Sequence, residues 1–373
     1  MSYDKEKALE LAQSTFLSCS VISKNQLAVL MVIDKGEDVW ETTPPVRLFI
    51  IPCDDPKKEW VRIIWHKDRW VFPTVEKASH DDLLIVDGQG GVYYSDESTG
   101  KGDGEDPIQN ELNMNCTYCN LSGLKNIHGE VYIVGSFRRV FRRKGENKWS
   151  IVSSDEMIAD AESRYDAARE KRRFFDTGFK CIDGFDALNE IYAAGENSDV
   201  WRFSDNQWLP IDIGFLDENI ISICCADDGF VYMGTRSVDN PGKVIKGRNN
   251  EWIELDLPFN SDIISIASFK GKTYIATSSQ LYIYDGGKVE AVKYNLPTNE
   301  VPLNAGFLSV GYGWMLSVGN SSISIFDGKE WKILYRASLM DEEASYALAS
   351  ELIKKSANLL ESLEDAVSKK NND

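Results

Sequence analysis

Histidine is scarce in this chain. Only His66, His80 and His128 occur among the 373 residues, and none lies near a candidate nucleophile in the sequence. Enzymes that use a Ser-His-Asp triad or a zinc-bound water need histidine at a defined place. Neither arrangement occurs here, so the sequence predicts no catalytic residue. Side chains from distant segments could still meet in the folded chain, which keeps an enzyme as the alternative.

Long hydrophobic runs are also absent. The longest wholly apolar run extends from Leu27 to Ile33, far short of the ~20 residues that a membrane-spanning helix needs. The chain begins MSYDKEKALELAQ, which is charged and helix-prone, unlike a signal peptide. Its seven cysteines are odd in number and scattered, unlike a disulfide framework. These absences predict a cytoplasmic location and no contact with membranes.

Positive charge is in deficit. Lys and Arg number 41 against 59 Asp and Glu, which gives a net charge of −18. A strongly acidic chain repels polyanions and attracts cationic surfaces. Nucleic acid is therefore not expected as a partner, whereas a basic protein is favoured.

No segment has the pattern of a metal or cofactor site. Cys116 and Cys119 have the spacing of zinc ligands with His128 nine residues later, but a second close pair is missing. The glycines of Val86–Tyr93 are followed by a second strand pattern, not by the helix that a dinucleotide loop opens. The acidic loop Gly102–Asp106 lacks the alternating ligands of a calcium hand. The sequence therefore predicts neither metal nor cofactor.

What the chain does contain is a repeat of short strands. Five similar copies each carry an aromatic residue near their start, at Tyr132, Tyr192, Tyr232, Tyr274 and Trp314. Those positions lie 60, 40, 42 and 40 residues apart. A period just above forty, with three or four strands per copy and no intervening helix, is typical of β-propeller blades.

Turns and tryptophans fall at fixed points within the copies. Asp285-Gly286 and Asp327-Gly328 supply the positive-φ residues of tight hairpins. A tryptophan follows the hairpin at Trp149, Trp208, Trp252 and Trp331, and Val289 takes its place in one copy. We expect these side chains to fill the space between adjacent blades.

Two looser copies precede the five. One begins at Thr15 and has four strand patterns with Trp60 at the tryptophan position, and the other begins at Asp82 and has one strand pair. Counting both predicts an all-β, seven-bladed propeller, and six blades if the Asp82 unit is only decoration.

In these features the chain resembles a divergent β-propeller of the kelch or WD type, over roughly Thr15 to Arg336. The double glycine of kelch repeats and the GH and WD pairs of WD repeats are missing. The resemblance therefore implies the fold, and neither family's function. In propellers, ligands and partners meet the face built by the loops between second and third strands and between blades.

Two helices are expected beside the ring. Ser153-x-x-Glu156 is a capping pattern, and Ile158, Ala161, Tyr165 and Ala168 form one stripe, which predicts an amphipathic helix within 153–175. A second apolar stripe, with six members from Leu348 to Val367, predicts a C-terminal helix within 337–373. That helix either packs on the ring or pairs with a second copy to form a homodimer. The predicted organisation is thus a short N-terminal helix at 1–14, a propeller at 15–336 and the C-terminal helix.

The partner-binding residues are predicted from the loops of the face described above. They are Trp40, Glu41, Phe137, Arg138, Asn197, Arg236 and Asp239. A basic cluster, Arg138 to Lys144, accompanies them on one strand pair. It either pairs with carboxylates of neighbouring blades or docks an acidic partner or a phosphate.

The sequence favours a non-enzymatic, protein-binding propeller. By analogy, strong acidity without a catalytic set suits an inhibitor or immunity-type partner of a basic protein. The alternative is a hydrolase or lyase whose site lies in the central funnel of the ring.

Overall fold

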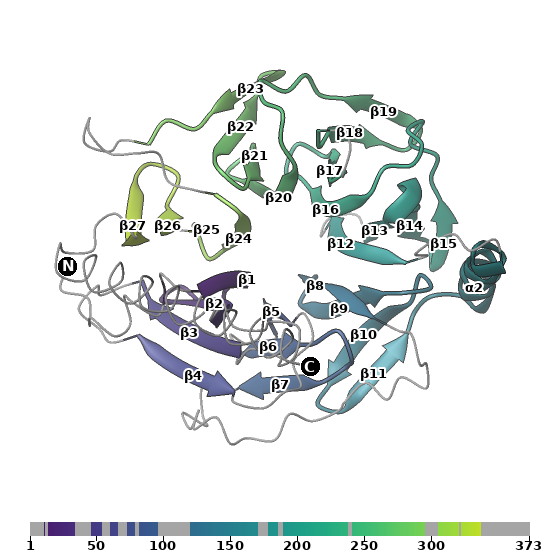
Figure 1. Ribbon diagram of the computed structural model, residues 1–373, viewed down its shortest axis with the longest axis horizontal. Coiled ribbons are helices and arrows are strands. Elements are labelled where there is room, and N and C mark those ends of the chain that lie inside the picture. Colours follow the sequence, from purple (N-terminus) through teal and green to yellow (C-terminus); the bar gives the residue numbers. More distant parts are fainter. Residues whose placement is uncertain are drawn as a thin grey trace, which may run out of the picture.

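Seven antiparallel sheets are arranged around a common centre in the computed structural model (Figure 1). The structure describes residues 11, 14–33, 46–53, 60–65, 73–78, 82–95, 120–170, 178–185, 189–237, 241–294, 305–320 and 322–336. Six sheets have four strands and one has three within these residues. The seven-bladed propeller predicted from the sequence is confirmed, and the unit that begins at Asp82 belongs to a blade of its own.

Each blade is formed by consecutive strands, numbered from the centre outward. Blades 1 and 2 contain β1 (Ser14–Val21), β2 (Gln26–Ile33), β3 (Val46–Pro52) and β4 (Val61–Trp65), then β5 (Thr74–Lys77), β6 (Leu83–Val86) and β7 (Val92–Ser95). Blades 3 and 4 contain β8 (Leu121–Ile127), β9 (Glu130–Gly135), β10 (Val140–Gly145) and β11 (Lys148–Ile151), then β12 (Phe179–Phe185), β13 (Glu190–Gly195), β14 (Val200–Ser204) and β15 (Gln207–Pro210).

The remaining blades follow the same plan. Blade 5 contains β16 (Ile220–Cys225), β17 (Val231–Thr235), β18 (Val244–Arg248) and β19 (Glu251–Glu254), and blade 6 contains β20 (Ile263–Phe269), β21 (Lys272–Thr277), β22 (Leu281–Asp285) and β23 (Lys288–Ala291). Blade 7 contains β24 (Phe307–Gly311), β25 (Trp314–Gly319), β26 (Ser322–Phe326) and β27 (Trp331–Arg336). The helix α2 (Asp155–Glu170) lies between blades 3 and 4, within the predicted insert, and a short 3₁₀ turn, η2 (Glu196–Ser198), joins β13 to β14. Residues 337–373, with the predicted C-terminal helix, and all but Leu11 and Ser14 of the predicted N-terminal helix lie outside the described residues.

The repeated tryptophans pack between blades. Trp208 of β15 contacts the apolar cluster shared by blades 3 and 4, and its indole N–H donates to the Val152 carbonyl oxygen over 2.9 Å. Trp149, Trp252 and Trp331 contact the clusters that join their own blade to the preceding one. Val289 is buried in the corresponding cluster of blades 5 and 6. Each blade thus uses its outermost strand to cover its predecessor.

Three of the repeated tyrosines, Tyr132, Tyr192 and Tyr232, donate their hydroxyl hydrogen to a carboxylate of their own blade. In blade 3, Tyr132 donates to Glu130 Oε2 over 3.0 Å, and Arg142, its register partner on β10, donates to the same oxygen over 3.3 Å. Blade 5 repeats this arrangement with Tyr232, Asp228 and Lys246. Arg142, a member of the basic cluster predicted from the sequence, therefore pairs with a carboxylate of its own blade.

Glycine at the end of the second strand has a steric cause. A Cβ on Gly195 would lie 1.8 Å from the Gly178 carbonyl oxygen, and one on Gly135 would lie 2.2 Å from that of Asn120. Only glycine permits the backbone of the first strand to approach so closely.

The ring closes between blades 7 and 1. No strand of one terminal region pairs into the sheet of the other within the described residues, so closure depends on side chains. A shared cluster contains Phe16, Leu27, Leu316 and Val318, and the backbone N–H of Val21 donates to Ser309 Oγ over 3.1 Å.

This closure leads to a first prediction. Leu316→Ala should lower the free energy of unfolding by about 2–5 kcal/mol, because it leaves a cavity in a fully buried cluster. Hydrogen exchange measured in the same variant should rise in blades 1 and 7 first. Equal acceleration in all seven blades would contradict closure as the weakest joint of the ring.

Candidate protein-binding face

Helix α2 lies at the edge of the ring, beside β11 and β15 (Figure 1). Through Asp160 and Tyr165 it contacts the turn that joins the second and third strands of blade 3. Arg138 of that turn also pairs with Asp199 of the corresponding turn in blade 4, so α2 shares a face with those turns. We call the surface formed by α2, the β9–β10 and β13–β14 turns, residues 236–237 after β17 and residues 211–219 the helix face.

The sequence of α2 explains how it attaches. Met157 and Ala161 are buried and Tyr165 is half-buried, spaced four residues apart along one side. The ring of Tyr165 meets Phe137 edge-on, with centroids 5.4 Å apart. Of the predicted stripe, Ala161 is buried and Ile158, Tyr165 and Ala168 are half-buried, while buried Met157 was not among its members.

The helix begins one residue later than its capping pattern suggested. Ser154 Oγ accepts from the Met157 N–H over 3.2 Å and is the N-terminal cap. Ser153 instead accepts from the Val140 N–H over 2.7 Å and donates to the Arg138 carbonyl oxygen over 2.8 Å. The predicted cap at Ser153 was wrong because the competing backbone groups lie on another strand.

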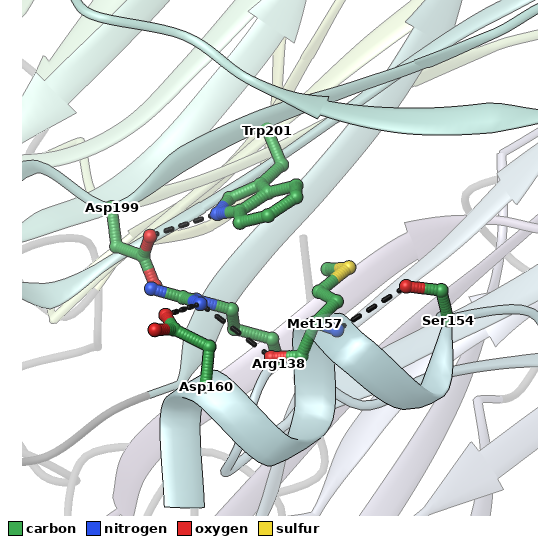
Figure 2. A network of polar contacts seen from close by, with 6 residues as sticks. All are labelled: Arg138, Ser154, Met157, Asp160, Asp199 and Trp201. Carbon is green, nitrogen blue, oxygen red and sulfur yellow. Dashed lines mark hydrogen bonds and ion pairs between the residues drawn. The ribbon is translucent and has the colours of Figure 1, made fainter. Parts of the chain in front are cut away.

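Arg138 is the main polar attachment of α2 to the ring (Figure 2). Its side chain is 2% exposed. Nε donates to Asp199 Oδ2 and Nη1 to Asp160 Oδ2, each over 2.6 Å. Burial opposes the charge, but the contacts with Asp199 and Asp160 outweigh it and raise the pKa of Arg138 above its ordinary value. One guanidinium thus joins the turn of blade 3, helix α2 and blade 4.

The surroundings of Arg138 fix its orientation. The guanidinium carbon lies 5.0 Å from the ring centroid of Trp201, within the range of a cation–π contact. The Trp201 indole N–H donates to Asp199 Oδ1 over 2.9 Å. Both Phe137 (φ 58°) and Arg138 (φ 55°) are left-handed, which is costly for such side chains and is stabilised here by their contacts with the helix.

The structure describes four of the seven predicted binding residues, and all four lie on the helix face. Phe137 and Arg138 are buried beneath α2, whereas Asn197 is half-buried in η2. Arg236 is 69% exposed and its Nε lies 3.4 Å from Asp262 Oδ2. Trp40, Glu41 and Asp239 lie outside the described residues.

One exposed apolar residue on this face was not singled out from the sequence. Leu216 is 84% exposed, in the link 211–219 between β15 and β16. Buried Ile213 anchors the link, and Glu218 fixes its far end by pairing with Lys243 and donating its N–H to Ser198 Oγ over 3.0 Å. Leu216 follows Phe215 in a short link that has neither strand nor helix periodicity, so no sequence signal marked its exposure.

The outward side of α2 is acidic. Its 16 residues include six carboxylates and two arginines. Asp160 and Glu162 pair with Arg138 and Arg139. The other four, Asp155, Glu156, Asp166 and Glu170, are exposed and form no ion pair with a described residue. The predicted pairing of the basic cluster with a neighbouring blade therefore holds for Arg138 through Asp199. Arg139 instead pairs with Glu162 of α2, and Arg142 pairs with Glu130 of its own blade.

A cavity of about 570 Å³ lies at the other end of the central channel, where the first strands of five blades end. Lys125 and Asp183 lie in its wall. The Asp183 carboxylate raises the pKa of the Lys125 ammonium, and burial raises the pKa of the Cys224 thiol. The amine is therefore held charged and the thiol neutral.

The described residues contain no group of three or more His, Cys, Asp or Glu side chains placed to hold a metal ion. None of the helices in this part of the chain is long and apolar enough to cross a membrane. Cys116 and Cys119 lie outside it.

These features define the class of the protein, a seven-bladed β-propeller. Solved propellers are similar in fold. Virginiamycin B lyase from Staphylococcus aureus, crystallised as an inactive variant with quinupristin, has a TM-score of 0.57 and 9% identity over 82% of this chain and 92% of that one. The WD40 β-propeller domain of Doa1 has a TM-score of 0.55 and 11% identity over 82% and 90%. Such low identities establish the fold alone.

A curated relative is similar in sequence. The immune protein Tsi7 of Pseudomonas aeruginosa is 32% identical over 232 residues, which cover 61% of this chain and 66% of Tsi7. About a third of that relative is therefore outside the match. No family model matches the chain.

Proposed function

We propose that this propeller is a non-enzymatic, immunity-type protein that binds and neutralises another protein through its helix face. The similarity to the immune protein Tsi7 is the observation that carries the proposal. The net charge of −18 independently favours a basic partner.

The composition of the helix face supports this use. Leu216 is a large apolar side chain on an anchored link, and exposed carboxylates of α2 belong to the same face. Interfaces combine a few apolar anchors with a polar rim, while complementary charge raises the association rate. The seven predicted binding residues remain part of the proposal, with Phe137 and Arg138 acting by holding α2.

The chemistry of the channel supports a non-enzymatic role over a hydrolase or lyase. A catalytic base or nucleophile needs a pKa near the working pH. The pKa of Lys125 and that of Cys224 are instead shifted away from the reactive forms of both groups.

A titration of the partner's activity separates these functions. The partner is first captured on the immobilised protein from cells of the same source, identified by mass spectrometry and purified. A binding inhibitor should abolish its activity at an equimolar ratio without changing its mass. Loss of activity at a hundredth of that ratio, or a cleaved or modified partner, would support the enzyme instead.

Location and assembly complete the proposal. We place the protein in the cytoplasm, where buried thiols such as those of Cys19, Cys181 and Cys224 would stay reduced. Homodimerisation through 337–373 is tested by sedimentation of the whole chain and of a chain ending at Arg336. A monomer in both cases would exclude it.

A further inference from the structure

The channel cavity is distinct from the helix face. It is lined by the ends of β8, β12, β16, β20 and β24, where these strands turn into the second strands of their blades. Figure 1 shows these strands around the centre of the ring. Helix α2 contacts the turns at the opposite ends of the second strands. A ligand in the cavity and a protein on the helix face would not compete for space.

Lys125, whose side chain carries three hydrogen-bond donors, lines this cavity. No hydrogen bond or short ion pair joins its ammonium to any residue that the structure describes. It is nonetheless charged, because Asp183 and Glu76 lie within electrostatic range. A charged ammonium in a cavity gains free energy when an acceptor of a ligand meets it.

The carboxylates around Lys125 are held by fixed donors. Asp183 Oδ2 accepts from the Cys225 N–H over 2.8 Å, and Asp227 Oδ2 accepts from the Gly271 N–H over 3.1 Å. Glu76 Oε1 accepts from Ser20 Oγ over 3.1 Å and from the Lys77 N–H over 2.8 Å. In the cavity wall two carboxylates, Asp183 and Asp227, face one ammonium, which leaves an acidic excess, and their orientation requires no rearrangement on binding.

We propose that the channel cavity binds a small organic cation that also carries a carboxylate, such as a basic amino acid. The cationic end would be attracted by Asp183 and Asp227, and the carboxylate would accept from Lys125. The volume of about 570 Å³ is within the range of small-molecule sites. Acidic excess disfavours a purely anionic ligand, and Lys125 disfavours a purely cationic one.

Three probes separate these contributions. L-Arginine has both ends, agmatine lacks the carboxylate, and L-citrulline lacks the cationic side chain. Calorimetric titration of the whole chain should give affinities at least tenfold weaker for agmatine and for L-citrulline than for L-arginine. Absence of binding by L-arginine at millimolar concentration, or equal affinities for all three, would overturn the proposal.

Variants tie the binding to the cavity. Lys125→Met should remove the preference for L-arginine over agmatine. Val310→Trp, at an exposed position of the cavity wall, leaves every charge in place. Because the larger side chain would occlude the cavity, the affinity for L-arginine should fall at least tenfold. Asp285→Asn, a change at an exposed position outside the cavity wall, is the control. Unchanged L-arginine affinity in Val310→Trp, with an unchanged unfolding midpoint, would place the binding elsewhere and contradict the proposal.

Discussion

Replacing Arg138 by methionine should lower the free energy of unfolding by about 3 kcal/mol, the lower end of the range for breaking a buried ion pair. The variant leaves Asp199, 13% exposed, without its cation, while Asp160 at 59% exposed can turn to water. Urea unfolding followed by tryptophan fluorescence measures the change, and limited proteolysis should cut α2 faster.

A neighbouring arginine supplies the control. Arg139 pairs from the same turn with Glu162, which is 46% exposed and can turn to water, so Arg139→Met should cost clearly less than Arg138→Met. The triple change Arg138→Met, Asp160→Asn and Asp199→Asn should recover part of the loss, since no uncompensated buried charge remains. Equal destabilisation by Arg138→Met and Arg139→Met would contradict the role given to Arg138.

Loss of the apolar anchor should have the largest effect on partner binding. Leu216→Asp should weaken the affinity for the captured partner by about 30-fold or more, the effect of losing a residue worth 2 kcal/mol at an interface. Folding should be unaffected, because the side chain is exposed. Surface plasmon resonance measures the affinity, and the loss should lie mainly in the dissociation rate.

Ile253→Asp is the matched control. Ile253 is an exposed apolar residue, at 58%, on the outermost strand of blade 5, so the same change of character there should leave affinity within about twofold. A comparable loss in both variants would mean that added negative charge, and not the helix face, weakens the complex.

Charge on α2 should act on the association rate. The double change Asp166→Lys and Glu170→Lys should slow association with a basic partner about tenfold at low salt, and the difference should shrink as salt rises. Glu251→Lys, an exposed change at the start of β19, is the control. Faster association of the double variant would mean that the partner surface is acidic.

The repeat was readable from the sequence because its physical causes are local. Tyr132 and its equivalents mark each second strand, and Trp208 and its equivalents mark each contact with the preceding blade, so their spacing predicted seven blades, with six as the alternative. Ser153 was misjudged and Met157 was overlooked, because the groups that each contacts lie on other strands. Burial of Arg138 could not be predicted for the same reason, since Asp160 and Asp199 lie 22 and 61 residues away.

The channel cavity was beyond sequence reasoning as well. Lys125, Asp183 and Asp227 belong to three blades, and each occupies an ordinary strand end or turn within its own copy. The packing of successive blades around the centre brings them together. Leu216 likewise became noticeable through its exposure, which the sequence does not encode locally.

Hydrogen exchange of the purified complex tests the central claim most directly, because it locates the partner on the ring. If the helix face is the binding surface, partner binding should slow amide exchange in α2 and residues 211–219, with little change in the turns that follow β8, β12 and β16. Protection confined to those turns, or no change in α2 and 211–219 at saturating partner, would show that the helix face is not the binding surface.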